Sequence, residues 1–103
     1  MAKNSGVDPR DVVSPQSTWQ LLAVLYESER WSMAIGRWKS DEGKWRPVLA
    51  QRWNGWAGGK GNPISRGFPT WFIMPDETYG LYLGSEFIPA AKLPFVKDTL
   101  GIT

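Results

Sequence analysis

The stretch 31–39, WSMAIGRWK, decides the fold of this chain. The odd-numbered positions hold the large apolar residues Trp31, Met33 and Ile35, whereas the even-numbered positions 32, 34 and 36 hold small residues, the last of which is Gly36. An alternation with a period of two predicts a β-strand with one buried face. After Gly36 the odd-numbered positions are basic instead of apolar. We therefore expect that end of the strand to be exposed to solvent on both sides.

The run 19–26 just before it, WQLLAVLY, is nearly all apolar. Such a run suits either a buried strand or a short buried helix, and periodicity alone does not separate the two. Ser17 and Gln20 even match a helix capping box. We favour a strand, because the run is short and a polar break at 27–30 divides it from the next strand-like stretch.

A third strand is expected after the stretch 31–39. Residues 40–44, SDEGK, are polar and include Gly43, which is available for a left-handed turn position, so they predict a hairpin loop. The strand then runs over 45–53. Pro47 lies within it and has no N–H to donate, which favours an edge position or a bulge near that end.

Glycine and proline break up the chain after this strand. Seven of them fall within 54–69, which predicts a long irregular loop, and loops of that length are often functional. A short strand is expected at 70–74, ending before Pro75. The stretch 76–88 opens with two carboxylates that favour a helix start but contains two glycines that oppose one, so helix and strand both stay open there. The stretch 94–100 predicts one or two helical turns.

These elements predict a single small domain over 17–103, of the α+β or mostly β class. Its centre is expected to be an antiparallel sheet of about four strands, with a short C-terminal helical element. The strands begin at Trp19, Trp31, Trp45 and Thr70. Residues 1–16 combine glycine and prolines with scattered charge and few apolar side chains, which predicts a flexible leader.

The composition excludes most catalytic chemistry. The 103 residues contain no histidine and no cysteine, which rules out disulfides, thiolate and imidazole metal sites, cysteine nucleophiles and histidine-based triads. We therefore expect a protein that is not an enzyme and carries no cofactor or metal. The longest apolar run, 21–25, is too short to cross a bilayer, and the polar start lacks the apolar region of a signal peptide. Both observations predict a cytoplasmic protein with no membrane partner.

The formal net charge of +2 hides an uneven distribution. Residues 1–36 carry −1, residues 37–66 carry +5 and residues 67–103 carry −2. Four of the seven tryptophans fall in the same basic middle third. The candidate binding residues of this segment are Arg37, Lys39, Lys44, Trp45, Arg46, Arg52, Trp53, Trp56, Lys60 and Arg66.

Basic side chains interleaved with aromatic ones are typical of proteins that bind single-stranded nucleic acid. Cations contact the phosphates, and flat rings stack on bases at about 1–3 kcal/mol each. The leading hypothesis is a small binding protein whose basic, Trp-rich face and glycine-rich loop contact nucleic acid or a ribonucleoprotein. Trp45, Trp53 and Trp56 would stack on nucleobases, and the seven basic residues would contact phosphates.

Three alternatives stay open at this point. In the first, the tryptophans are core residues with basic stems packed along their edges, which is our expectation for Trp19, Trp31 and Trp71. In the second, the same face binds a protein, as in a regulator or inhibitor encoded by a mobile element or phage. In the third, an exposed strand edge forms a structural homodimer.

The glycine-rich stretch 55–61, GWAGGKG, does not match the known phosphate-binding motifs. A Walker-type loop needs glycine where Asn54 stands and serine or threonine where Gly61 stands. A dinucleotide fingerprint needs glycine where Ile64 stands. An anion cradle built from backbone amides and Lys60 is the weaker alternative.

A set of spaced motifs resembles a pattern in small uncharacterised bacterial proteins. The motifs are Arg52-Trp53-Asn54-Gly55, Gly61-Asn62-Pro63, Arg66-Gly67 and Pro69-Thr70-Trp71-Phe72 ending at Pro75. The resemblance covers roughly residues 31–76, implies no activity and transfers no functional residue. It implies that the glycine-rich loop and its flanking strands form one structural unit.

Overall fold

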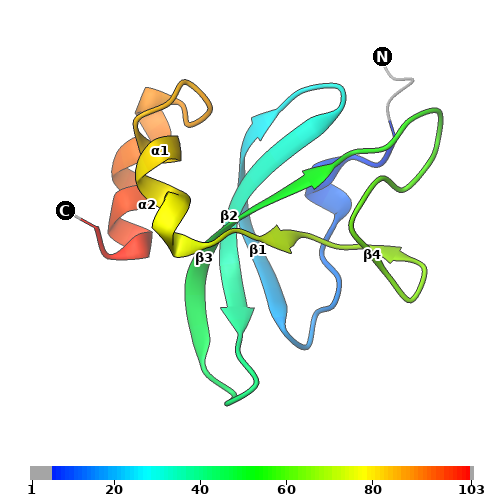
Figure 1. Ribbon diagram of the computed structural model, residues 1–103, viewed down its shortest axis with the longest axis horizontal. Helices are drawn as coiled ribbons and strands as arrows, with labels where there is room; N and C mark the ends of the chain where they lie inside the picture. Colours follow the sequence, from blue (N-terminus) through cyan, green and yellow to red (C-terminus); the bar gives the residue numbers. More distant parts are fainter. Residues whose placement is uncertain (1–5, 103) are drawn as a thin grey trace.

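A computed structural model of the protein describes residues 6–102 (Figure 1). The strands are β1 (Trp19–Glu27), β2 (Trp31–Lys39), β3 (Trp45–Trp53), β4 (Ile64–Ser65), β5 (Phe68–Pro69) and β6 (Phe72–Ile73). The α-helices are α1 (Tyr79–Leu83) and α2 (Leu93–Leu100), and short 3₁₀ helices cover Pro9–Asp11, Asp76–Thr78 and Ala90–Lys92. Three long strands are thus followed by a region of short strands and then by a helical region.

Four strands form one antiparallel sheet in the order β1-β2-β3-β6. β2 pairs with β3 over its full length, from Trp31 opposite Trp53 to Lys39 opposite Trp45. β4 and β5 form a separate hairpin. The predicted antiparallel sheet of about four strands with C-terminal helices is therefore confirmed, and the run that begins at Trp19 is a strand.

Both faces of β2 are buried, so the prediction of a single buried face is wrong. Met33 and Ile35 are 0% exposed on one face, and Ala34 is 0% exposed on the other. The ring of Trp19 lies over Gly36, where a Cβ atom would come within 2.4 Å of that ring. Gly36 therefore makes room for an aromatic ring, and the small residues at 32, 34 and 36 are buried rather than exposed to water.

The first hydrophobic core lies between the sheet and the helical region. It joins Ile35 and Leu49 of the sheet to Tyr79, Ile88 and Val96. The Tyr79 hydroxyl accepts a hydrogen bond from the backbone N–H of Leu49 at 3.2 Å, and burial raises the pKa of this hydroxyl. Figure 1 shows the helices gathered on one side of the sheet, away from the N-terminal segment.

The second core lies on the opposite face of the sheet, beneath the N-terminal segment. Val12 packs there with Trp19 and Trp71, and the Trp71 indole N–H donates to the Val12 carbonyl at 2.7 Å. Pro9 is buried as well. Residues 6–16, whose composition predicted a flexible leader, therefore pack on the sheet through a few apolar side chains. Residues 1–5 of that leader lie outside the described residues.

Pro47 lies near the start of β3, just after the 40–44 turn. On one side it is opposite Arg37 of β2. On the other side, β6 pairs only with Ala50 and Gln51 of β3. Within the described chain, β3 thus has a free edge beside Pro47, which agrees with the expected edge position.

The expected loop 54–69 contains regular structure. Backbone hydrogen bonds between Trp53 and Asn62 close its first part, residues 54–61, into a loop. Beyond them, β4 and β5 form a hairpin whose turn residues, Arg66 and Gly67, have φ values of 53° and 84°. Positive φ at both turn positions suits the twist of a tight hairpin. The segment is therefore a closed loop followed by a hairpin, rather than one long irregular connection.

The region after β6 is helical. The stretch 76–88, for which helix and strand were both open, contains α1, which ends before Gly84. α2 ends before Gly101, whose φ of 76° provides a left-handed cap. No helix between residues 6 and 102 is long and apolar enough to cross a bilayer.

Candidate binding site

Asn54 anchors the base of the glycine-rich loop. Its side chain is 2% exposed; it accepts a hydrogen bond from the Ser32 hydroxyl and donates one to the Ser28 carbonyl, both at 3.0 Å. Its backbone N–H donates to the carbonyl of Arg30, and its own carbonyl accepts from the N–H of Val7. One residue thus ties the loop to the β1–β2 turn and to the N-terminal segment.

Two glycines allow the loop to close on itself. Gly61 has a φ of 69°, and a Cβ atom there would lie 1.9 Å from the carbonyl oxygen of Trp53. Gly55 has a φ of 96°, and a Cβ atom there would lie 2.6 Å from the backbone nitrogen of Gly61. Only glycine tolerates this combination of φ and close backbone approach. The RWNG and GNP motifs therefore meet in space at the mouth of the loop.

Arg52 is a buried cation that braces this loop. It is 2% exposed, and its guanidinium donates to the backbone carbonyls of Thr70 and Lys60. Its Nε has no hydrogen-bond partner among the described residues, and burial lowers the pKa of Arg52 to about 10. The sequence predicted a phosphate contact here. The guanidinium is instead hydrogen-bonded to backbone carbonyls, so Arg52 contributes to the lining of the pocket described next but is not an exposed cation for a phosphate.

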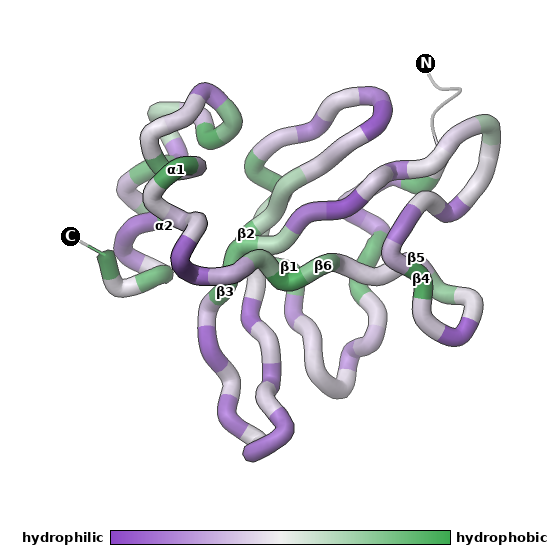
Figure 2. The backbone as a smooth tube through the Cα atoms, in the orientation of Figure 1, coloured by the Kyte–Doolittle hydropathy of each residue, from purple (hydrophilic) through white to green (hydrophobic). Residues whose placement is uncertain are grey.

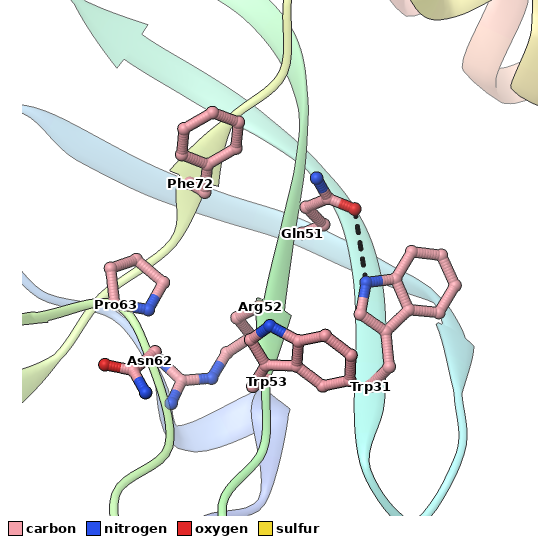
Figure 3. Close-up of a pocket in the computed structure, with 7 residues that line it drawn as sticks. All are labelled: Trp31, Gln51, Arg52, Trp53, Asn62, Pro63 and Phe72. Atoms are coloured by element: carbon pink, nitrogen blue, oxygen red, sulfur yellow. Dashed lines mark hydrogen bonds between the residues drawn. The ribbon is translucent and has the colours of Figure 1, made fainter.

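An open pocket lies where the loop meets the end of β3 (Figure 3). Its volume is about 430 Å³. The lining residues are Trp31, Gln51, Arg52, Trp53, Asn62, Pro63 and Phe72. Trp53 is 59% exposed and Phe72 is 51% exposed. Large apolar side chains gathered in contact with water often mark a binding surface, and we call this site the aromatic pocket.

One wall of the aromatic pocket is held by packed rings. Trp31, expected in the core, is half-buried at its edge. Its indole N–H donates to Gln51 Oε1 at 3.2 Å, and its ring centroid lies 5.3 Å from that of Tyr26 and 5.2 Å from that of Phe87. The position of the Gln51 amide is therefore set by a ring that is itself packed between two others.

Three exposed basic residues belong to the segments that form this end of the molecule. The guanidinium carbon of Arg30 lies 5.7 Å from the ring centroid of Trp56. The Lys60 ammonium donates to the Gly67 carbonyl at 2.6 Å. Arg66 is exposed at the turn of the β4–β5 hairpin. The glycine-rich loop region thus carries positive charge beside the aromatic pocket, whereas in the β1–β2 turn Arg30 is next to the exposed Glu29.

The other predicted binding residues lie at the opposite end of β3. They are Arg37, Lys39, Lys44, Trp45 and Arg46. All belong to the β2–β3 hairpin, whose tip is hydrophilic in Figure 2. Trp45 and Trp53 begin and end β3, and a nine-residue strand separates them by about 27 Å. The single basic face predicted from the sequence is therefore two separate groups.

The covered middle of β3 lies between these two groups. Leu49 is 0% exposed there and packs against Tyr79 and Val96. At the hairpin end, Trp45 lines its own pocket of about 420 Å³ beside residues of β1 and the N-terminal segment. That pocket has one exposed ring, at Trp45, whereas the aromatic pocket has two. We therefore take the aromatic pocket as the candidate binding site.

The tryptophans of the described chain are divided between water and the interior. Trp56 is 60% exposed, and Trp45 and Trp53 are exposed as well. The alternative that places these three rings in the core is wrong. Trp19 and Trp71 are buried, as expected.

Several residues of the aromatic pocket were not anticipated from the sequence. Those outside the predicted set are Trp31, Gln51, Asn62, Pro63 and Phe72. Hairpin alignment of the strands 31–39 and 45–53 carries a usable signal, because it places Trp31 beside Trp53 and Met33 beside Gln51. Phe72 has no such signal, since β6 is only two residues long and pairs with β3 across the whole loop.

Comparisons of the chain with protein-family models, with curated proteins and with solved structures found no match. Among residues 6–102, no group of three or more His, Cys, Asp or Glu side chains is placed to hold a metal ion. The aromatic pocket is therefore the feature from which a function has to be inferred.

Proposed function

We propose that this is a non-enzymatic binding protein that contacts single-stranded nucleic acid, free or within a ribonucleoprotein, at the aromatic pocket. The observation that supports this most strongly is the pair Trp53 and Phe72, each more than half exposed at one pocket of about 430 Å³. Aromatic rings in water stack on bases, and every base offers a flat face to such a ring.

The aromatic pocket suits an unstacked base better than a duplex. A paired base offers only its edges in a groove, whereas a splayed base offers its faces to rings and its edges to amides. Trp53 and Phe72 come from β3 and β6 and stand at different sides of the pocket in Figure 3. Gln51 and Asn62 add amides to the lining. Ring faces combined with amides are the usual means of recognising a single strand.

The phosphate contacts in this proposal come from Arg30, Lys60 and Arg66. All three are exposed and belong to the segments around the pocket. Each phosphate that a cation neutralises releases counterions, so affinity falls as salt rises. For three contacts on a single strand, the logarithm of the association constant is expected to fall with the logarithm of salt with a slope of about −2.

Fluorescence anisotropy of labelled single-stranded oligonucleotides, measured from low to physiological salt, tests the proposal. Trp53→Ala and Phe72→Ala are each expected to weaken binding about 5- to 150-fold, the loss of one stacked base. Trp45→Ala is the matched control, because it removes a ring of similar exposure from the other end of β3, and it is expected to leave affinity unchanged. Absence of binding at low salt, or equal losses from Trp45→Ala and Trp53→Ala, would contradict the proposal.

A protein partner is the second candidate function, favoured by the residue types on the same surface. Tryptophan and arginine are enriched at interface hot spots, and here the guanidinium of Arg30 lies over the exposed ring of Trp56. A partner protein would be retained by the parent chain and lost with Trp56→Ala. If oligonucleotides do not bind and this loss is observed with an identified partner, the second candidate replaces the first.

The third alternative, a homodimer through a strand edge, would use β1, which ends the main sheet. Register irregularities fall between Leu21 and Ala23 and between Val24 and Tyr26. The Lys92 ammonium also donates to the Val24 carbonyl at 3.1 Å. Bulges and lysines are the usual means of keeping an edge strand from pairing. Light scattering across a concentration series is therefore expected to report a monomer, and a dimer would favour the third alternative.

A further inference from the structure

The β4–β5 hairpin is attached directly to the wall of the aromatic pocket. The Thr70 N–H donates to the carbonyl of Pro63 at 2.9 Å, so the hairpin ladder extends one pair beyond Ile64 and Pro69. Pro63 itself lines the pocket. Figure 2 shows β5 joined to β6, which carries Phe72, by a short run of chain without a sharp bend. The hairpin therefore continues the surface of the pocket outward.

The ladder of this hairpin places Phe68 on the face of the pocket. Side chains alternate along a strand, and residues paired across a ladder point to the same face. Phe68 pairs with Ser65, and Ser65 is two residues after Pro63, which lines the pocket. The side chains of Pro63, Ser65 and Phe68 therefore share one face of the hairpin.

The alternation along the chain toward β6 gives the same face. Trp71 and Ile73 pack in the second core, whereas Phe72 between them is exposed and lines the aromatic pocket. The stretch 71–73 thus alternates as a strand does. Phe68 is four residues before Phe72, an even number, so the alternation again places its side chain on the face of the pocket.

The surroundings of Phe68 suit a negatively charged strand. Its ring is 61% exposed. The Lys60 ammonium donates to the carbonyl of Gly67, the residue just before Phe68, at 2.6 Å, and Arg66 is exposed at the same turn. Residues 43–75 contain no Asp or Glu. A free ring with cations beside it and no acidic residue in the segment is the combination that stacks on bases while contacting phosphates.

We propose that Phe68 is a second stacking residue, and that a single strand runs from the aromatic pocket along the β4–β5 hairpin with its phosphates at Lys60 and Arg66. This inference rests on the proposed function and adds a direction and a length to it. Four residues of extended chain separate Phe72 from Phe68 by at most about 13 Å. A stacked strand covers that distance in about four steps, so the track holds about five nucleotides.

A thymidine heptanucleotide and a thymidine dinucleotide test the track, because the first reaches both rings and the second only one. Phe68→Ala is expected to weaken heptanucleotide binding about 5- to 150-fold, the loss of one stacked base. It is expected to leave dinucleotide binding in the pocket unchanged, whereas Trp53→Ala should weaken both. Anisotropy of a labelled heptanucleotide measures the first affinity, and displacement of that probe by the dinucleotide measures the second.

Two variants serve as matched controls. Ile64 is 46% exposed on the same hairpin, but it is next to Ser65 in the strand and therefore points to the opposite face. Phe95 is 47% exposed on α2, in the helical region. Ile64→Ala and Phe95→Ala are both expected to leave heptanucleotide affinity unchanged. Circular dichroism of each variant checks that it is folded.

The salt dependence tests the phosphate contacts of the track. Lys60→Gln removes one cation beside Phe68, so the salt slope for the heptanucleotide should become shallower by about 0.7. Lys44→Gln removes an exposed lysine just before β3, at the tip of the β2–β3 hairpin, and should leave the slope unchanged. Equal slopes for Lys60→Gln and the parent would overturn the assignment of a phosphate to Lys60.

The outcomes separate this inference from the proposed function. If Trp53→Ala weakens the binding of both ligands and Phe68→Ala weakens neither, the track is overturned and the pocket stands. If Ile64→Ala costs as much affinity as Phe68→Ala, the placement of Phe68 on the face of the pocket is overturned. If neither ligand binds the folded protein at low salt, the proposed function fails, and the inference fails with it. A loss in Phe68→Ala that is confined to the heptanucleotide supports both.

Discussion

The Trp71 indole N–H donates to the Val12 carbonyl at 2.7 Å, although the two residues are 59 positions apart in the chain. Val12 is 0% exposed and Trp71 is 7% exposed. This bond joins the segment before the sheet to the segment after the glycine-rich loop. The N-terminal residues are thereby part of what holds the second core together.

Trp71→Phe is expected to lower the free energy of unfolding by about 1–3 kcal/mol, because it leaves the Val12 carbonyl buried without its partner. Urea denaturation followed by circular dichroism measures the change. The matched control is Trp56→Phe at a ring that is 60% exposed, where a change below about 0.5 kcal/mol is expected. Equal losses at the two positions would refute the role given to the Trp71 bond.

Arg52→Lys is expected to loosen the glycine-rich loop. The planar guanidinium of Arg52 donates to two carbonyls at once, those of Thr70 and Lys60, and a single ammonium does not reproduce that fork. Loss of one charge-assisted bond predicts a destabilisation of about 1.5–3 kcal/mol. Limited proteolysis should then cut within 54–62 faster than in the parent. Arg46→Lys, at an exposed position, is the control, and loop cleavage at the parent rate in Arg52→Lys would contradict the bracing role.

Gly61→Ala and Gly58→Ala are expected to differ sharply although both glycines have positive φ, 69° and 85°. A Cβ atom at Gly61 would lie 1.9 Å from the Trp53 carbonyl oxygen, whereas one at Gly58 meets nothing within 4 Å. Gly58→Ala should cost about 1–2 kcal/mol for its backbone conformation alone. Gly61→Ala should cost more and should weaken oligonucleotide binding, since the loop mouth cannot close. Similar thermal denaturation midpoints for the two variants would contradict this account of the loop.

Tyr79→Phe is expected to be destabilising at neutral pH, by about 1 kcal/mol, because the Leu49 N–H loses its acceptor. Burial raises the pKa of Tyr79 in the folded state. The unfolded chain therefore ionises this hydroxyl first, and the contribution of Tyr79 to stability is full below about pH 10 and declines as the pH rises above it. The gap between parent and variant should thus narrow above about pH 10 in urea denaturation. A gap that widens there would show that the sign is wrong.

The part of the fold that could be predicted rests on sequence patterns within single strands and turns. The alternation that starts at Trp31, the apolar run that starts at Trp19 and the polar turn at 40–44 are all local, and the sheet follows from them. The burial of residues 6–16 depends instead on Trp71, which lies far along the chain. No period in the sequence expresses a contact of that kind, so composition alone suggested a free leader.

A comparison of two arginines shows why the candidate site was only partly predictable. Arg46 and Arg52 lie on the same strand and had the same expected role. Arg46 is exposed at the hairpin end, whereas Arg52 is covered by the loop that begins two residues later. The Arg52 guanidinium donates to the carbonyls of Lys60 and Thr70, and those groups reach it only because the chain folds back at the loop, which the residue type alone does not indicate.

The placement of Trp45 and Trp53 at the two ends of one strand also limits what a short ligand can reach. β3 is nine residues long and paired to β2 throughout, so its two end residues are about 27 Å apart. A fully stacked nucleic-acid strand advances about 3.4 Å per nucleotide, so one of fewer than about eight nucleotides that lies at Trp53 does not reach Trp45. The length of β3 thus keeps the hairpin end of the molecule out of reach of a short stacked strand at the aromatic pocket.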